Sequence, residues 1–209
     1  MTLVNIKQGP VTRTRPSPQP ATLEDIDALP PDLIGEIIDG VLYSRNRPSP
    51  AHQFAAGEVH LDLGLAFGRG RGGPGGWWIL LDPALALPDS PHVVPDVAGW
   101  RRDRMPEMPG GAIAVVPDWV CEVLSPTTRR DDVLIKMPKY AKSGVLHAWL
   151  VDVETRVVTA HRLQSGLWLA IGTYSAETEA RIEPFDAVPL NVAQWRPPAG
   201  SVEGEGDAP

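Results

Sequence analysis

Two acidic residues lie inside apolar segments of the sequence, Asp96 in VVPDVAGW and Glu122 in PDWVCEVLSP. A carboxylate inside a run that reads as a buried strand is costly to desolvate unless a cation or hydrogen bonds compensate it. Lys136 follows further along the chain. Two acids around a divalent ion, with a lysine that assists an attacking water, form a minimal set for metal-assisted phosphodiester hydrolysis.

The two acids are expected to meet at one end of a sheet. Strand alternation places each of them on one face of its segment, and paired strands would bring those faces together. Two neighbouring carboxylates repel, whereas a divalent cation between them favours their charged forms. Because oxygen ligands suit magnesium or manganese better than zinc, we expect Mg²⁺ or Mn²⁺ at Asp96 and Glu122. The alternative for Asp96 is a turn or capping carboxylate after Pro95.

Lys136 lies three residues after Val133 and four before Tyr140, so helical spacing places it on the side that faces the sheet. There its ammonium could orient or help to deprotonate a water and offset charge in the transition state. The alternative is a lysine that lies along an amphipathic helix and keeps its charge in water.

Weaker candidates have ordinary explanations. His52 could contact a phosphate or cap a helix, although a lone histidine is more often partly exposed and without such a role. Asp82 at a predicted strand end is a candidate for a second metal, or a simple Asp-Pro turn. Cys121 is best explained as a small core residue. The GRGRGG segment has the GxGxxG spacing, but no strand clearly precedes it, so a dinucleotide site is excluded.

Capping residues, turn motifs and apolar periodicity predict the helices and strands that must position these residues. Thr22 predicts the N-cap of a short helix that ends before Pro30. Asp39-Gly40 supplies a tight hairpin turn within EIIDGVLYSRN. A helix is expected from Ser49-Pro50 through AHQFAAGEVHLDLGLAFGRG.

A sheet and a second helix are expected after this point. The runs WWILLDPALAL, HVVPDVAGW and DWVCEVL read as adjacent strands of one sheet. RRDDVLIKMPKYAKSG then predicts a helix that Pro138 should bend or split and that ends near Gly144. Two more strands, HAWLVDVETRVVTAHRL and GLWLAIGTYS, complete an α/β arrangement without an internal repeat.

Length and composition suggest one ordinary domain. The 209 residues divide into a predicted flexible tail at 1–21, a single domain at 22–195 and a second flexible tail at 196–209. A lone cysteine excludes an intramolecular disulfide, and no signal peptide or membrane helix is predicted, so a soluble cytoplasmic protein is expected. The net charge of -7 argues against indiscriminate nucleic-acid binding, although small arginine clusters leave room for a local basic path.

Several segments in order carry a family resemblance. They are EIIDG at 36–40, SPAH at 49–52, VVPD at 93–96, EVLSP at 122–126, and the run Asp132, Lys136, Tyr140, Gly144, Val145, Trp149 and Asp152. With these segments the chain resembles the Uma-type restriction endonuclease family of the PD-(D/E)XK nuclease superfamily. The resemblance extends from about Glu36 to Asp152, more than half of the chain.

The resemblance implies a restriction-endonuclease-like core, a central mixed β-sheet flanked by helices. It implies that Asp96 and Glu122 hold magnesium, that a lysine assists, and that Glu36 is a further ligand candidate. In the broader superfamily the lysine follows the second acid by two positions, but Leu124 stands there in this sequence, so the role passes to Lys136. His147 replaces a usual glutamate, and Pro138 is atypical for the helix.

The leading hypothesis is therefore a magnesium-dependent endonuclease that acts on DNA. The alternative is a non-catalytic nuclease-like module that binds nucleic acid or a protein partner; action on RNA or on mobile-element DNA uses the same chemistry and stays open. A homodimer is expected, because two related active sites cut both strands of a duplex most simply. Trp77, Trp78 and Trp100 are candidates for its surface or, equally, for the core.

Overall fold

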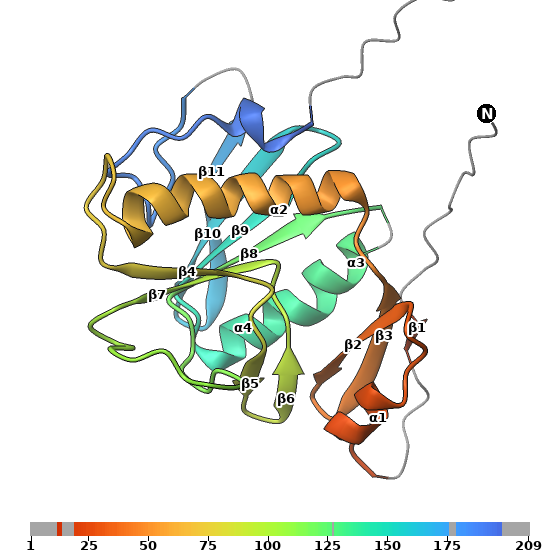
Figure 1. Ribbon diagram of the computed structural model, residues 1–209. Helices are drawn as coiled ribbons and strands as arrows, with labels where there is room; N and C mark the ends of the chain where they lie inside the picture. The colour runs from red at the N-terminus through yellow and green to blue at the C-terminus, as the bar shows by residue number, and fades with distance from the viewer. Residues whose placement is uncertain (1–11, 14–18, 127, 176–178, 198–209) are drawn as a thin grey trace, which may run out of the picture.

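The computed structural model describes residues 12–13, 19–126, 128–175 and 179–197. The predicted tails at 1–21 and 196–209 fall mostly outside these residues, and the single domain between them stays a proposal. The chain forms two sheets with helices, as Figure 1 shows. The six-stranded sheet has the order β11-β10-β9-β8-β7-β4, and the five-stranded sheet has the order β1-β3-β2-β6-β5. This mixed α/β architecture confirms the predicted fold class.

The strands of the large sheet are β4 (Trp77–Leu81), β7 (Val97–Arg101), β8 (Trp119–Leu124), β9 (His147–Asp152), β10 (Val157–Gln164) and β11 (Leu167–Ser175). The strands of the smaller sheet are β1 (Thr12–Arg13), β2 (Leu33–Ile38), β3 (Val41–Asn46), β5 (Leu85–Leu87) and β6 (Ser90–Val93). The helices are α1 (Leu23–Asp27), α2 (Pro50–Leu63), η1 (Gly64–Gly68), α3 (Arg129–Asp131), η2 (Asp132–Lys136), α4 (Met137–Ser143) and η3 (Val192–Trp195). Only β8 and β9 run parallel among the pairs of the large sheet, which makes it mixed.

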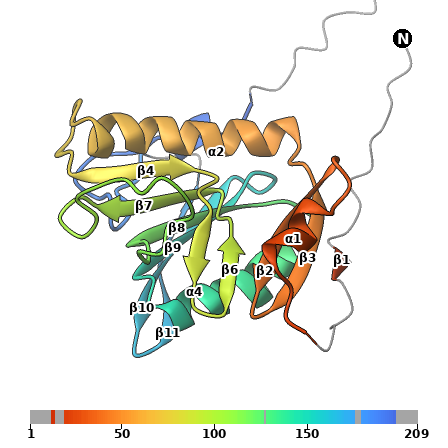
Figure 2. The same cartoon turned by 60° about the horizontal axis from the view of Figure 1, so that its bottom comes forward.

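Helices cover both faces of the large sheet. In Figure 1 and Figure 2, α2 lies across one face, while α3, η2 and α4 lie across the other. Side chains of β8 alternate between the two layers, because Cys121 belongs to the apolar cluster that contains Val59 of α2, whereas Val120 belongs to the cluster that contains Tyr140 of α4. Glu122 has the same parity as Val120, so β8 directs it toward the α4 side.

The local signals at the N-terminal half are confirmed. Thr22 caps α1 in a capping box with Asp25, whose carboxylate accepts the Thr22 N–H at 2.7 Å. Asp39 and Gly40 both have positive φ and turn β2 into β3, as a two-residue hairpin requires. Ser49 caps α2 by accepting the His52 N–H. Each of these signals is short-range, so the residues alone could specify it.

The sheet differs from the prediction in four places. The run WWILLDPALAL is divided, because β4 belongs to the large sheet and β5 to the small sheet. The run around His92 contributes to the small sheet, because β6 pairs with β2 at Ile37. Asp96 lies in a bend before β7 rather than inside a strand. The segment read as one strand at 147–163 is two, because a turn after Asp152 folds β10 back on β9. The predicted pairing of β4, β7 and β8 is correct.

The second helix contains a π-helical turn. Residues Asp132–Lys136 form this turn, and α4 continues from Met137 to a left-handed Gly144 cap. Pro138 has no N–H to donate to the preceding turn, and the wider winding accommodates its ring. Val133 was expected on the same helix face as Lys136 and Tyr140, and this expectation is wrong. Val133 is exposed, whereas Lys136 and Tyr140 are buried, because the winding of the helix changes at this turn.

The predicted tryptophan surface is largely core. Trp77 and Trp100 are buried, and Trp78 is partly buried. Among the described residues no helix is long and apolar enough to cross a membrane.

Candidate active site

Asp96 lies at the end of the large sheet where α2 begins. Its carboxylate is almost fully buried, and Oδ2 accepts the Val123 N–H at 2.7 Å. His52 Nε2, from the first turn of α2, lies 3.1 Å from the same oxygen as an ion pair. Burial lowers the pKa of His52, but Asp96 more than offsets this effect, so the pKa is raised and the charged imidazolium is favoured. Oδ1 has no hydrogen-bond partner among the described residues. One oxygen is thus held by the fold, and the other is buried and unsatisfied.

Glu122 is the centre of a buried polar cluster. Lys136 Nζ donates to its Oε2 at 2.8 Å, and the Tyr140 hydroxyl donates to its Oε1 at 2.6 Å. Lys136 also donates to the carbonyl oxygen of Val94 at 2.8 Å, two residues before Asp96. The helix therefore places an ammonium between the segment that carries Asp96 and the strand that carries Glu122.

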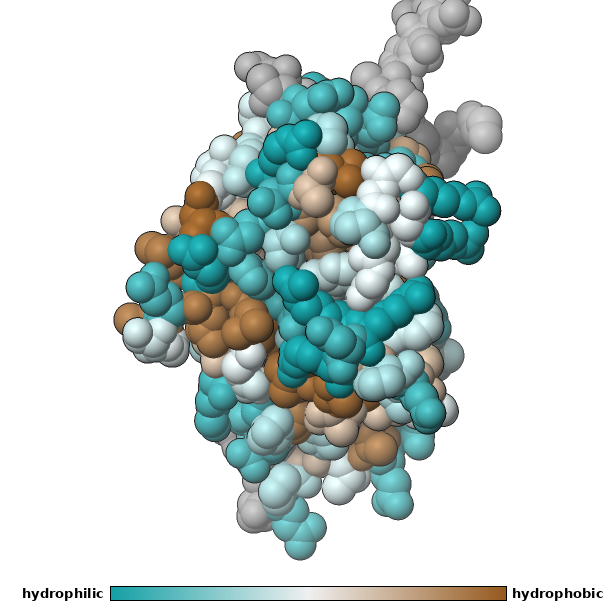
Figure 3. Space-filling model, turned by 90° about the vertical axis from the view of Figure 1, so that its left-hand side faces the viewer, coloured by the Kyte–Doolittle hydropathy of each residue, from teal (hydrophilic) through white to brown (hydrophobic). Residues whose placement is uncertain are grey.

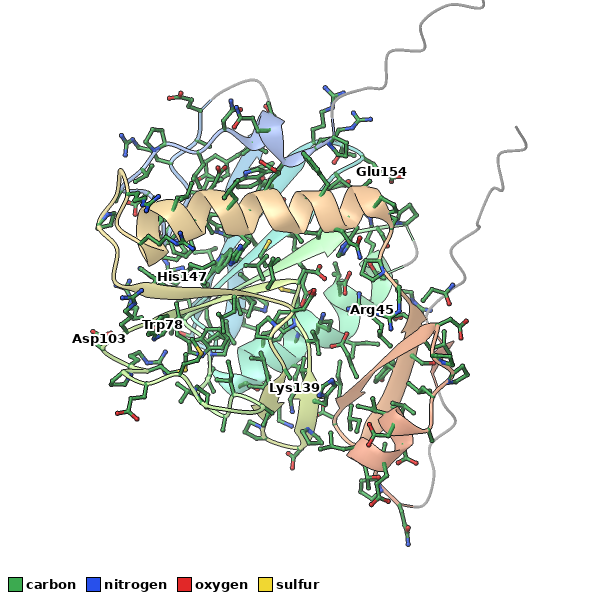
Figure 4. All side chains as sticks on the ribbon, viewed as in Figure 1. Arg45, Trp78, Asp103, Lys139, His147 and Glu154 are labelled. Carbon is green, nitrogen blue, oxygen red and sulfur yellow. The ribbon has the colours of Figure 1, made fainter. Side chains whose placement is uncertain are left out.

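Glu36 connects the β2–β3 hairpin to this cluster. Its Oε2 accepts the Val94 N–H at 2.9 Å, and its Oε1 lies 3.6 Å from Lys136 Nζ and 3.3 Å from an Arg45 nitrogen. Figure 4 shows Arg45 where the hairpin faces the rest of the fold. Arg45 Nε is buried without a hydrogen-bond partner among the described residues.

Asp132 adds a fourth carboxylate at the π-helical turn. It is buried beside Thr128 and within electrostatic reach of Lys136 and Asp96. Burial raises its pKa to about 6, although the charge of Lys136 opposes that rise. A pocket opens here between the hairpin and the helix. Its lining includes Glu36, Tyr43, Arg45, Thr128, Asp132 and Lys136.

The two central acids have opposite pKa shifts. Burial raises the pKa of Asp96, but His52, Lys136 and Arg45 more than offset this effect and lower it to about 2. Burial raises the pKa of Glu122 well above its usual value, while Lys136 opposes that rise and Asp96 adds to it. Burial also lowers the pKa of Lys136, but the surrounding carboxylates raise it overall, so the ammonium stays charged.

The charged groups of the cluster bear on whether it fits a metal ion. Four carboxylates, Asp96, Glu122, Asp132 and Glu36, interact with the Arg45 guanidinium. The Lys136 ammonium is a second cation among them. No group of three or more His, Cys, Asp or Glu side chains in the described part of the chain is arranged to hold a metal. Magnesium is usually held by one or two carboxylates and several waters. The buried and unsatisfied Asp96 Oδ1 is therefore the donor of this cluster that fits a divalent cation.

The structure brings all four predicted site residues together. Lys136 contacts Glu122 and the Val94 carbonyl, two residues before Asp96, and Glu36 contacts Lys136 and the Val94 N–H. Their catalytic and metal-binding roles stay proposals. The arginine clusters lie elsewhere or are engaged in the fold, since Arg104 pairs with Asp118 and Arg102 covers Trp78. In Figure 4, Trp78 and Asp103 lie at the other end of the sheet from Arg45.

Sequence reasoning gave too little weight to four neighbours. Tyr140 and Asp132 stand four residues on either side of Lys136, a spacing that could have marked them as partners on one helix face. His52 follows a strong helix cap, which could have located it at a helix start. Arg45 carries no local signal, because only the folding of the hairpin against the helix brings it to the site.

Comparisons with known proteins show the family of the chain and a solved structure of similar fold. Residues 22–193, more than half of the chain, match the family model described as "Uma2: Putative restriction endonuclease". The crystal structure of a protein described as a putative nuclease, from Anabaena variabilis, has a similar fold with a TM-score of 0.64 and 22% sequence identity, covering 84% of this chain and 97% of that chain. No curated protein matches the chain. The chain therefore belongs to the Uma2 family of putative restriction endonucleases.

Proposed function

We propose that this protein is a metal-dependent endonuclease that hydrolyses phosphodiester bonds of DNA. The observation that carries the proposal is the Lys136 ammonium, buried 2.8 Å from Glu122 and joined through the Val94 carbonyl to the segment of Asp96. Two acids and a lysine gathered at one sheet end, in a chain of this family, fit hydrolysis better than a purely structural ion pair.

The proposed roles follow from the contacts. Asp96 Oδ1 and the Glu122 carboxylate would hold Mg²⁺ or Mn²⁺, which would polarise the phosphate and activate a water. Lys136 orients that water and offsets the negative charge that develops on the phosphate oxygens. Tyr140 fixes the Glu122 carboxylate, and Glu36 fixes Lys136 and the Val94 backbone. These groups keep the site organised before substrate arrives.

Cleavage of supercoiled plasmid and of single-stranded DNA in magnesium or manganese tests the proposal. Wild-type protein should nick or linearise the plasmid, and chelation should abolish the reaction. Asp96→Asn and Glu122→Gln remove a ligand charge at nearly constant shape, so each should lower the rate by about a hundredfold or more. Lys136→Met should lower it comparably.

Matched variants separate chemistry from folding. Asp62→Asn changes a half-buried acid that accepts from Trp195, and Lys139→Met changes a buried lysine on the next helical turn that pairs with Asp39. Both lie outside the proposed site and should leave the cleavage rate within about threefold. Equal cutting by wild type, Asp96→Asn and Glu122→Gln would mean that the site assignment is wrong.

One observation favours a second candidate, a non-catalytic module that binds nucleic acid or protein. Both Glu122 oxygens already have protein donors, Lys136 and Tyr140, so the acid could serve the fold. Calorimetry with manganese distinguishes the two. Saturable heat that Asp96→Asn abolishes supports the nuclease, whereas DNA binding without metal binding or cleavage supports the module.

A further inference from the structure

The end of the large sheet that lies away from the candidate site carries an exposed group of arginines. The segments 68–76 and 100–104 contain five arginines and one acid, whereas the whole chain has a net charge of -7. All five arginines are exposed: Arg69, Arg71, Arg101, Arg102 and Arg104. Figure 3 shows the face at this end, where hydrophilic side chains gather between apolar patches. Positive charge concentrated on one face of an acidic protein indicates an anionic ligand.

Two of these arginines hold the fold together at this end. Arg102 donates from Nη2 to the Gly68 carbonyl at 2.8 Å and from Nε to the Trp77 carbonyl at 3.2 Å, so it joins the end of β7 to the glycine-rich loop. Arg104 pairs with the buried Asp118 at 2.8 Å. Arg102 and Arg104 therefore fix the two segments that carry the other three arginines.

The other three arginines have no partner that neutralises them. Among the described residues, the side chains of Arg69 and Arg71 make neither an ion pair nor a hydrogen bond, and Arg101 lies over the ring of Trp77, 4.8 Å from its centroid. Arg69 lines an open groove of about 330 Å³ between α2 and β4. A guanidinium that no carboxylate neutralises keeps its donors for phosphate, which it can bind through two parallel hydrogen bonds.

The distance between this arginine group and the candidate site suits a DNA duplex. Arg101 ends β7 and Asp96 precedes that strand, so the two are five positions apart, about 17 Å at the rise of a β-strand. The DNA axis advances about 3.4 Å for each base pair, so about five base pairs cover that length. In Figure 4 the two regions lie at opposite ends of the sheet, with Asp103 at one end and Arg45 at the other. One duplex is long enough to contact both.

We propose that Arg69, Arg71 and Arg101 bind the phosphate backbone of the DNA substrate about five base pairs from the bond that is cut. The inference rests on the proposed function and adds a substrate-binding surface to it. The three arginines come from two separate segments on an open surface, so they suit a backbone that offers several phosphates rather than one small anion. Contacts of this kind position the duplex and do not read its base sequence.

The salt dependence of DNA binding measures these contacts. Binding of a labelled duplex of about 30 base pairs, followed by fluorescence anisotropy with a chelator present, should weaken as salt rises, because each phosphate contact releases counterions. Arg69→Gln, Arg71→Gln and Arg101→Gln should each reduce the slope of log K against log salt by about 0.9, and the triple variant should weaken binding near 0.1 M salt by at least about tenfold. Arg156→Gln removes an exposed arginine in the turn after β9, at the other end of the sheet, and should leave the slope unchanged.

Cleavage kinetics separate this surface from the chemistry. The three arginines would bind the duplex equally before and during the reaction, so the triple variant should raise KM by at least about tenfold and keep kcat within about threefold. Higher salt should narrow the difference in KM between the variant and the wild type, because it screens the contacts that the variant lacks. An unchanged KM together with an unchanged salt slope would overturn the surface.

Chemical modification of the wild-type protein provides a test that needs no variant. Phenylglyoxal reacts with exposed guanidinium groups, and mass spectrometry should show that duplex DNA protects Arg69, Arg71 and Arg101 but not Arg156. Saturable DNA binding without this protection would overturn the surface and leave the proposed function standing. Protection and the expected slopes without cleavage in metal would support the surface and contradict the proposed chemistry. Failure of the wild type to bind DNA would overturn both.

Discussion

Asp132 is a buried carboxylate whose ionisation is opposed by its surroundings. Its pKa rises from 3.8 to about 6 in the folded chain, chiefly because of burial. Below the unfolded pKa the acid is protonated in both states and costs nothing. As pH rises from the unfolded pKa to the folded pKa, the unfolded chain releases the proton while the folded chain keeps it, so stability falls, and the loss is complete above about pH 6. A difference of about two pKa units corresponds to about 3 kcal/mol above neutral pH.

Asp132→Asn should therefore stabilise the metal-free protein at high pH. We expect a gain of up to about 3 kcal/mol in the free energy of unfolding near pH 7.5, and about half of that near pH 5. Urea unfolding with a chelator present measures it. Asp131→Asn, a neighbouring acid that is less buried, should show a much smaller change. A gain for Asp132→Asn that is the same at both pH values would contradict the assignment.

Tyr140 contributes a single hydroxyl to the centre of the site. Tyr140→Phe leaves a buried oxygen of Glu122 without its donor, which should lower the free energy of unfolding by about 1–3 kcal/mol. Because the two groups are in direct contact, the losses in Tyr140→Phe and Glu122→Gln should not add in the double variant. Denaturant unfolding of the four proteins measures the coupling, and simple additivity would show that the contact is not formed in solution.

At the scale of elements, the π-helical turn aligns three polar side chains. In a regular α-helix every fourth residue advances by about 40° around the axis, so Asp132 and Tyr140 would diverge by about 80°. The wider winding of Asp132–Lys136 counteracts this drift, and Asp132, Lys136 and Tyr140 all face the sheet. π turns are frequent at functional sites, and here the reason is geometric.

We expect that Pro138 maintains this winding, so its replacement should affect activity more than stability. Pro138→Ala restores an N–H that lets the helix return to regular α geometry and turn Asp132 away from Tyr140. We expect unchanged or higher thermal stability, because proline is unfavourable inside a helix, together with slower DNA cleavage. Thermal unfolding and plasmid cleavage are the two measurements. If both stay at wild-type values, the turn does not depend on Pro138.

At the scale of the whole molecule, the exposed edge strand β4 is protected against edge-to-edge pairing. His60 Nε2 lies 3.1 Å from the Ile79 carbonyl, and Arg102 Nε donates to the Trp77 carbonyl at 3.2 Å. Figure 3 shows the face at the left of Figure 1, where apolar and hydrophilic side chains alternate. Exposed Leu61 and Leu65 belong to a groove beside this edge. β4 is therefore a poor candidate for extending the sheet across a dimer.

The homodimer is a proposal that rests on the proposed cleavage of both DNA strands. Two active sites that face opposite strands would cut a duplex most simply, so light scattering at micromolar concentration should give twice the 22.6 kDa of one chain. Titration with a DNA duplex during the measurement tests dimerisation on the substrate. A single chain per particle both with and without DNA would refute the dimer and leave nicking of one strand as the activity.

The sequence predicted those features that depend on neighbouring residues and missed those that have no local signal. Thr22, Ser49 and Asp39-Gly40 placed their caps and turn correctly, because each acts on the next few backbone groups. The turn between β9 and β10 was missed, since Arg156 adopts a positive φ without a glycine to announce it. Asp96 was placed in a strand because its apolar flanks resemble one.

The sequence alone identified Asp96, Glu122 and Lys136 as candidate site residues, because an acid with apolar neighbours is visible in adjacent residues, and it matches the Uma2 family model. The tertiary structure decided which groups touch them: His52 beside Asp96, Tyr140 on Glu122, and Arg45 on Glu36. Those pairs join separate elements, and their contacts arise from packing of α2, the hairpin and the π-helical turn around one sheet end. Sequence periodicity does not predict contacts between separate elements, because these contacts depend on the sum of many weak interactions along the whole chain.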